Sequence, residues 1–282
     1  MQRVVLGYDG STASASALEW IAERARRTRI DLDVVLVTNM FLSDRVEADR
    51  VLDAAARRWR DLVPGSWANV LRVDGLLPGT LASAAHGADL LVLGVDAGSR
   101  TRTMRGGGMP LRTALSAGVP TALVPAGWTA VDAPVVVGLD DDDSSGAALL
   151  FAASAASSAE VPLHVLHAWL MGAPRATASV ALRPSSRRTA DTHARIVDAA
   201  VERVRDGFPA LSVMTELVRD NPTSALTRAA AHASLLVIGS HGRGAVAGSL
   251  LGSVGWDLVG RLDRPMCVVP AGGSTAAHAE AT

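Results

Sequence analysis

The sequence predicts an α/β protein made of two tandem domains, each with a doubly wound, parallel sheet of five strands. Its 282 residues suffice for two domains of ordinary size. A strand pattern recurs, because the segment Val4–Asp9 matches the segment Val135–Asp140. Apolar runs alternate with helical patterns along both copies, which is typical of a parallel sheet covered by helices on both faces.

In the first copy, the hydrophobic runs and their periodicity predict alternating strands and helices. The expected strands are Arg3–Gly7, Asp33–Thr38, Val70–Val73, Asp89–Gly94 and Thr121–Val124. The expected helices are Arg45–Leu62, Gly79–His86, Leu111–Ala117 and an Ala-rich helix that ends near Arg27 after a cap at Ser11 or Thr12.

The repeat also predicts the domain bounds. We expect a first domain over residues 1–126, a second over 134–271 and a flexible tail over 272–282, with Ala126–Pro134 as linker. The second copy is longer than the first. Its extra residues fall in Leu170–Arg188, which is rich in Ala, Ser, Pro and Arg and is expected to be a loop.

Composition excludes several classes of function. Hydrophobic residues make up 49% of the chain, which indicates a globular protein. The net charge of −1, without an arginine-rich face, argues against nucleic acid as a partner. We find no apolar run of the roughly 18 residues that a membrane span needs and no signal peptide, so we expect a cytoplasmic protein. The single cysteine, Cys267, is expected to be a buried core residue.

A glycine-rich segment near the C-terminus carries the clearest chemical signal. An apolar run, Leu235–Ile238, ends at Gly239, and Gly252-Ser253 opens a helical segment before the final apolar run Met266–Val269. With Gly242, these residues have the spacing G-x2-G-x9-G-S. A loop and helix N-terminus of this kind present backbone N–H groups to a phosphate, which Arg243 would also contact.

This arrangement resembles the nucleotide-binding signature of the universal stress protein family, whose fold is of the adenine nucleotide alpha hydrolase type. The resemblance covers nearly the whole chain as a tandem pair. It implies the strand order 3-2-1-4-5 in each domain and the binding of ATP, with or without Mg²⁺. It also implies adenine near His167-Ala168, and last strands, Thr121–Val124 and Met266–Val269, that pair across a pseudo-dimer interface.

The candidate binding residues lie at the expected carboxyl ends of strands, where such sheets bind ligands. Asp140 is suited to accept a hydrogen bond from a ribose hydroxyl or to hold a magnesium ion. The nucleotide-binding residues expected in the second copy are Gly138, Leu139, Asp140, His167, Ala168, Gly239, Ser240, His241, Gly242, Arg243, Gly244, Gly252, Ser253 and Val254.

The first copy departs from this motif. Its candidates are Gly7, Asp9, Gly94 and Gly107, but Ala97 replaces the second glycine and Gly108 replaces the serine. Ala97 disfavours a positive φ, and Gly108 removes a hydroxyl. Three arginines in the same loop offer compensating charge: Arg100, Arg102 and Arg105. We expect this copy to keep the fold with a weakened or lost site.

Other readings of the motifs are less well supported. The chain has no lysine, which excludes a Walker phosphate loop and Schiff-base chemistry. The run Asp140–Asp143 suits a metal site or, more simply, a solvated turn in which Asp142 or Ser144 caps the next helix. His164 and His167 are expected on opposite faces of one strand, so they form no metal pair. The Gly242–Ala247 segment fits a dinucleotide fingerprint but follows a fourth strand rather than a first.

The family resemblance predicts that the protein is an ATP-binding regulator in a stress response, with an unidentified protein partner. The chain is expected to form an intramolecular pseudo-dimer or a homo-oligomer. One alternative is a slow ATP hydrolase or phosphotransferase, for which Asp140 and His241 are the candidate groups. Another is a protein-interaction module without a ligand.

Overall fold

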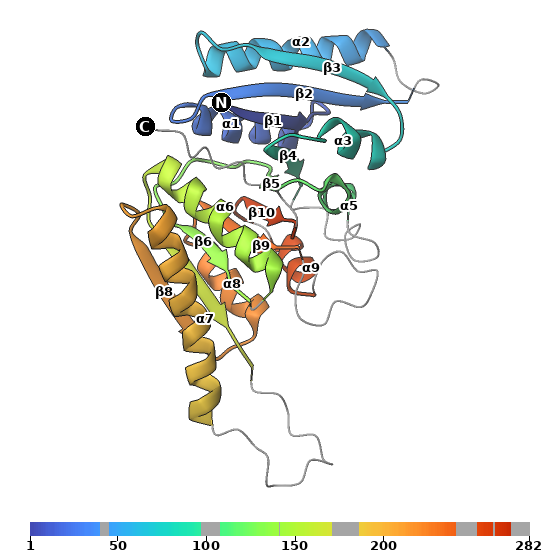
Figure 1. Cartoon of the computed structure of the whole chain (residues 1–282). Helices are drawn as coiled ribbons and strands as arrows, with labels where there is room; N and C mark the ends of the chain where they lie inside the picture. The colour runs from blue at the N-terminus through green and yellow to red at the C-terminus, as the bar shows by residue number, and fades with distance from the viewer. Residues whose placement is uncertain are drawn as a thin grey trace, which may run out of the picture.

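The structure is a computed structural model that describes residues 1–39, 45–96, 108–140, 142–170, 186–240, 253–261 and 263–271 (Figure 1). The N-terminal half contains β1 (Gln2–Gly7), α1 (Thr12–Ala25), β2 (Ile30–Thr38), α2 (Arg45–Leu62), β3 (Ala68–Asp74), α3 (Gly79–Ala84), β4 (Leu90–Val95), α5 (Met109–Ala117) and β5 (Thr121–Pro125). The C-terminal half contains β6 (Val135–Gly138), α6 (Asp143–Ala159), β7 (Leu163–Ala168), α7 (Ser186–Gly207), β8 (Val213–Val218), α8 (Pro222–Ala230), β9 (Leu235–Gly239), α9 (Ser253–Val259) and β10 (Met266–Val269).

The strands of the described residues form one continuous sheet in the order β3-β2-β1-β4-β5-β10-β9-β6-β7-β8. Within each half the strands are parallel and follow the predicted order 3-2-1-4-5. The halves meet where β5 and β10 pair in antiparallel fashion, with Ala122 opposite Cys267 and Leu123 opposite Met266. The predicted pairing of the two last strands is therefore confirmed, and it occurs within one chain.

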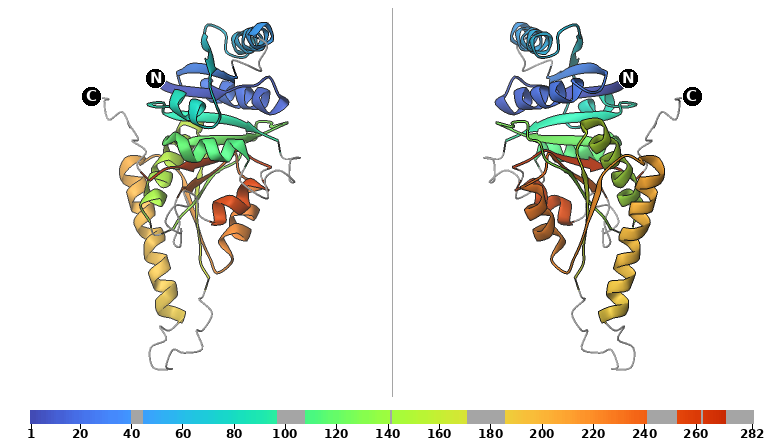
Figure 2. Two further views of the ribbon diagram at one scale, coloured as in Figure 1. Left: turned by 90° about the vertical axis from the view of Figure 1, so that its right-hand side faces the viewer. Right: turned by 90° about the vertical axis from the view of Figure 1, so that its left-hand side faces the viewer.

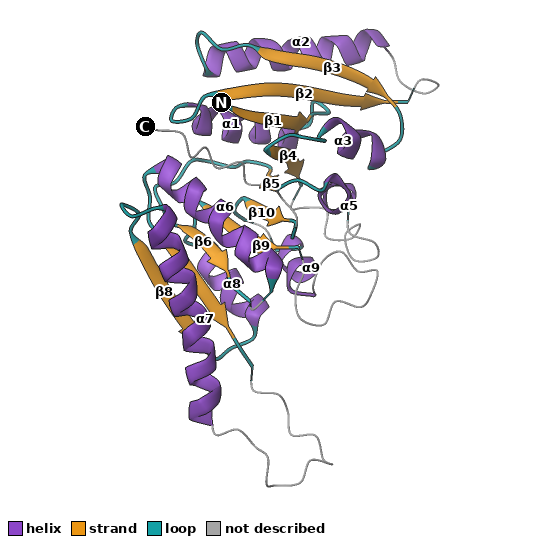
Figure 3. Cartoon of the chain, in the orientation of Figure 1, coloured by secondary structure: helices purple, strands orange, loops and turns teal. Residues whose placement is uncertain are grey.

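Helices cover both faces of the sheet, as the two turned views of Figure 2 show, and Figure 3 distinguishes helices from strands by colour. Side chains alternate along each strand, so β1 places Val4 and Leu6 in one apolar cluster and Val5 in the other. The first cluster lies under α1, α2, α6 and α7, and it contains residues of both halves. The second lies under α3, α5, α8 and α9. This two-sided burial confirms the doubly wound architecture.

Short polar residues begin the helices that follow the strands. The Ser11 side chain accepts a hydrogen bond from the Ser14 N–H at 3.2 Å and caps α1. The Asp142 side chain accepts one from Ser145 N–H at 2.7 Å and caps α6. Asn221 does the same for α8, with Pro222 as its first residue. The first two caps were among the predicted alternatives, and they satisfy N–H groups that have no partner within the helix.

Several elements begin or end at other residues than the sequence predicted, and β2 and α7 are the clearest cases. Strand β2 begins at Ile30 rather than Asp33, because its pairing with β1 extends back to Gln2. Helix α7 begins at Ser186, inside the region that was expected to be a loop to Arg188. Serine is favourable at a helix start and arginine is a strong helix former, so these residues extend the helix. The remainder of the predicted loop, residues 171–185, lies outside the described residues.

Cys267 is fully buried in β10, as predicted. Burial raises the pKa of its thiol, so the sulfur stays protonated.

Among the helices of the described residues, none combines the length and the hydropathy needed to cross a membrane.

Candidate functional site

The predicted site lies where the two central strands of the C-terminal half end. Strands β6 and β9 pair in parallel, from Val135 opposite Leu235 to Val137 opposite Val237. On their outer sides, β6 pairs with β7 and β9 pairs with β10. The strand order thus reverses between β6 and β9, which is where ligands of open parallel sheets bind, beyond the carboxyl ends of the strands.

A cavity of about 380 Å³ lies at this reversal. Its volume is within the usual range for small-molecule sites. Its wall combines apolar side chains from β7, α8 and β9 with a few polar groups. Of the predicted binding residues, those that line the cavity are Gly138, Leu139, Asp140, Ala168, Gly239 and Val254. The structure therefore brings together the strand ends that the sequence motif separates by about a hundred residues.

The turn after β6 is tied to its neighbours on both sides. The Leu139 N–H donates to the Leu166 carbonyl at 2.9 Å, which continues the ladder with β7. The Asp140 N–H donates to Ser145 Oγ at 3.0 Å, and Ser145 itself is buried near the start of α6. These bonds set the direction of the chain at Asp140. A site whose walls are fixed in this way loses little conformational entropy when a ligand binds.

Gly138 allows close packing beside the cavity. A Cβ atom at this position would lie 3.0 Å from Leu226 Cδ2 and 3.5 Å from Ile238 Cγ2. Both of those side chains also line the cavity. A larger residue at position 138 would therefore push into the apolar wall rather than into solvent.

The other end of the motif is described only in part. Gly239 lines the cavity, whereas Ser240 is buried and its N–H donates to the Val269 carbonyl at 2.8 Å, so Ser240 joins β9 to β10. Ser253 is the first residue of α9. The remaining predicted residues of the motif lie outside the described part of the chain: His241, Gly242, Arg243, Gly244 and Gly252.

His167 does not line the cavity, although its neighbour Ala168 does. Its ring is buried on the opposite face of β7, where Nδ1 lies 2.7 Å from the Leu139 carbonyl oxygen and Nε2 lies 2.7 Å from His193 Nδ1 on α7. Since a carbonyl oxygen only accepts, Nδ1 carries the proton in the first bond. His167 thus supports the turn next to Asp140 from behind.

His164 confirms the predicted alternation, because it lies on the other face of β7 from His167. Its Nε2 atom is 3.2 Å from Glu216 Oε2 on the neighbouring strand β8. Across the described ranges, no cluster of three or more His, Cys, Asp or Glu side chains has the arrangement of a metal site.

Several lining residues were not predicted from the sequence. Asn221 and Thr223 come from the start of α8, and Asp257 comes from α9. Asn221-Pro222 follows the carboxyl end of β8 and has the pattern of a helix start. This pattern is the feature of the sequence from which these lining residues could have been predicted. Asp257 adds a second carboxylate to the cavity besides Asp140.

Glycines at the corresponding strand ends of the N-terminal half are also closely packed. A Cβ atom at Gly94 would collide with the backbone of Ala13, and one at Gly7 would lie 2.7 Å from the Cδ2 atoms of Leu81 and Leu93. The helix after β3, α3, begins at Gly79, and the residue before it, Pro78, provides no side-chain cap. Gly107, like Ala97 and the three arginines of the loop, lies outside the described residues.

The comparisons with known proteins agree with this fold. Residues 133–270 match the family model described as "Universal stress protein family". The C-terminal half of the chain is therefore a universal stress protein domain.

The similarity to relatives extends over both halves. The universal stress protein Rv1996 of Mycobacterium tuberculosis is 28% identical, with 94% of each chain covered. Rv2005c of the same organism is 29% identical, covering 89% of this chain and 91% of the relative. The crystal structure of a universal stress protein from Archaeoglobus fulgidus superposes with a TM-score of 0.71 at 18% identity, over 95% of this chain and 96% of that one. This last likeness supports the tandem fold.

Proposed function

We propose that the C-terminal half binds an adenine nucleotide, with ATP as the expected ligand, in the cavity between the ends of β6 and β9. The observation that carries the proposal is that Asp140 and Gly239 line the same cavity. Gly239 begins the G-x2-G-x9-G-S motif, and α9 starts at the serine that ends it. A strand end with an acceptor, beside a glycine-rich loop that leads into a helix, matches the chemistry of a ribose joined to phosphates.

The lining residues fit such a ligand. Leu166, Leu226 and Ile238 supply apolar surface suited to the flat face of a purine. Asp140 and Thr223 supply oxygen atoms suited to ribose hydroxyls. If Mg²⁺ accompanies the nucleotide, the carboxylates of Asp140 and Asp257 are the lining groups that would hold it, and the ion would neutralise phosphate charge.

The role that we propose is regulatory, as an ATP-dependent switch in a stress response. Nucleotide occupancy would favour one arrangement of the loop and of α9, and an unidentified protein partner would recognise that arrangement. The pairing of β5 with β10 supports the pseudo-dimer within one chain. The domain bounds, the weakened first site, the cytoplasmic location and any further association of chains stay predictions from the sequence.

The first test is the nucleotide content of the purified protein, released by heat and identified by chromatography. We expect about one adenine nucleotide per chain, bound in the C-terminal half. Two per chain would contradict the weakened N-terminal site. ADP recovered after loading with ATP would favour the hydrolase. No bound nucleotide, and no binding of added ATP with magnesium by calorimetry, would overturn the proposal and favour the interaction module.

A matched pair of variants locates the site. We expect Asp140→Ala to weaken ATP binding about tenfold or more, because it removes a charged hydrogen-bond acceptor. Asp9→Ala, the corresponding change after β1, is expected to leave the affinity unchanged. Isothermal calorimetry of both variants measures this. The reverse pattern would place the nucleotide in the N-terminal half.

A further inference from the structure

A second, larger cavity lies between the two halves. It is at the amino ends of β6 and β9, whereas the proposed nucleotide site is at their carboxyl ends. Its volume is about 510 Å³. It is bounded by the C-terminal part of α1, by the linker before β6 and by the end of α6. Val135 and Leu235, the first residues of β6 and β9, line it, whereas the last residues of the same strands line the other cavity. The two cavities are therefore separate.

Arg24 is the unusual residue of this interdomain cavity. Its Nε atom is sealed from solvent and has no hydrogen-bond partner. Its nearest polar contact is at the limit of hydrogen-bond length, 3.5 Å from Nη2 to Gln2 Oε1. No ion pair of the described residues includes Arg24, and burial lowers the pKa of its guanidinium. A buried charge without a counter-charge costs free energy, which a bound anion would recover.

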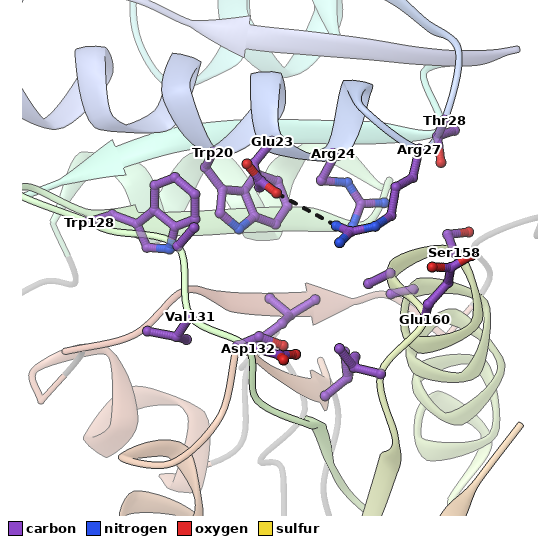
Figure 4. A pocket seen from close by; sticks show the side chains of 17 residues that line it. Trp20, Glu23, Arg24, Arg27, Thr28, Trp128, Val131, Asp132, Ser158 and Glu160 are labelled. Carbon is purple, nitrogen blue, oxygen red and sulfur yellow. Dashed lines mark ion pairs between the residues drawn. The ribbon is translucent and has the colours of Figure 1, made fainter.

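Aromatic surface lies beside this charge. Trp20 on α1 and Trp128 in the linker lie close together at one end of the cavity, and Arg24 lies further along the same wall (Figure 4). The Arg24 guanidinium carbon is 5.1 Å from the centre of the Trp20 ring. Trp128 is partly exposed and offers apolar surface to a planar group, whereas Trp20 is 5% exposed and belongs to the core behind the cavity. Arg27 also lines the cavity, but its guanidinium pairs with Glu23 at 3.6 Å.

The rim limits the charge of a ligand. Asp132 and Glu160 are exposed carboxylates at the edge of the cavity, on the linker and at the end of α6. They would repel a group with several negative charges, such as a nucleotide triphosphate. A partly buried guanidinium without a counter-charge, near the Trp128 indole and within an acidic rim, is suited to a ligand with a single negative charge and a flat apolar body.

We propose that the interdomain cavity binds a small aromatic monocarboxylate, whose carboxylate pairs with Arg24 and whose ring packs on Trp128. Such a ligand contacts α1 of the N-terminal half and the linker that leads into the C-terminal half. Its binding would therefore fix the two halves relative to each other, independently of the nucleotide.

Indole-3-carboxylate is a suitable probe for the full-length protein. We expect saturation-transfer NMR to show binding of indole-3-carboxylate to the wild type. The uncharged indole-3-carboxamide should bind with an affinity at least about tenfold lower. Arg24→Met is expected to abolish binding of the carboxylate without lowering the thermal midpoint, because it replaces a buried charge with an apolar side chain of similar length. Arg26→Met, on an exposed neighbour of the same helix that pairs with Glu23, is the matched control and should bind as the wild type does.

A second variant tests the cavity without touching Arg24. Ala130→Trp places a large side chain at its mouth and should abolish probe binding, whereas Thr129→Trp, one residue earlier in the exposed linker and outside the lining, should not. Saturating ATP should leave probe binding unchanged. Absence of probe binding to the wild type, equal binding to Arg24→Met or Ala130→Trp, or displacement by ATP would each overturn the proposal.

Discussion

The aspartates that follow β1 and β6 occupy corresponding places in the two halves but make different contacts. Asp9 Oδ1 accepts the N–H of Ser11 at 3.0 Å, so its carboxylate belongs to the turn before α1. At Asp140 it is the backbone N–H that is held, by Ser145 Oγ. Burial acts to raise the pKa of Asp9, but hydrogen bonds with Ser11 and Ser14 outweigh it, so the pKa lies below the ordinary value of 3.8.

This lowered pKa predicts a pH dependence of stability. A carboxylate with a depressed pKa stabilises the folded state above the pKa of the unfolded chain, and this contribution is lost as the pH falls through the lower, folded value. We expect Asp9→Asn to be less stable than the wild type above about pH 5, and the difference to shrink as the pH falls below 3.8. Urea denaturation at stepped pH measures it. Asp31→Asn, an exposed site on β2, controls for net charge, and a difference unchanged to low pH would contradict the prediction.

At the scale of elements, α6 carries the turn that shapes the proposed nucleotide cavity. Its cap, Asp142, accepts the N–H of Ser145, and Ser145 Oγ in turn accepts the N–H of Asp140. The start of the helix and the end of β6 are therefore joined through one serine. The sequence predicted the cap as one of two choices, and only the folded helix selects between them.

The cap is testable by substitution. Asp142→Ala should lower the free energy of unfolding by about 1 kcal/mol, since the Ser145 N–H loses its acceptor. Asp142→Asn should retain most of the stability, because an amide oxygen also caps a helix. Chemical denaturation of the three proteins gives the comparison. Equal losses in both variants would show that charge, rather than capping, is responsible.

At the scale of the whole molecule, the halves are joined by the β5–β10 ladder and by a shared apolar cluster that includes Val124 and Cys267. We expect one cooperative thermal transition for the full chain, with calorimetric and van't Hoff enthalpies that agree. Two separate transitions would indicate that the halves unfold independently.

A variant at the junction extends this prediction. Val268 is buried on β10 opposite Thr121, so Val268→Asp buries an unpaired charge between the halves. We expect a loss of about 3 kcal/mol or more. Met214→Asp, at an exposed position of β8, is the control and should change little. A similar loss at both sites would count against a structural role for the junction.

Much of this architecture follows from the sequence alone. The repeated strand with its terminal aspartate, the alternation of apolar runs with helical patterns and the glycine spacing are local properties of the chain. They predicted the elements, the doubly wound class and the strand ends at which the cavity lies. The family resemblance supplied the strand order and the pairing of the last strands, which no local pattern contains.

Only the tertiary structure decides which side chains meet. Strand periodicity places His167 and Ala168 on opposite faces of β7, but which face borders the cavity depends on where α7 and α8 pack. Likewise, Asn221 and Thr223 line the proposed nucleotide cavity, and Arg24 lines the interdomain cavity together with the linker, because segments far apart in sequence pack together. Local patterns specify which residues share a face of a helix or strand. Which element packs on that face depends on how the whole chain buries its apolar surface.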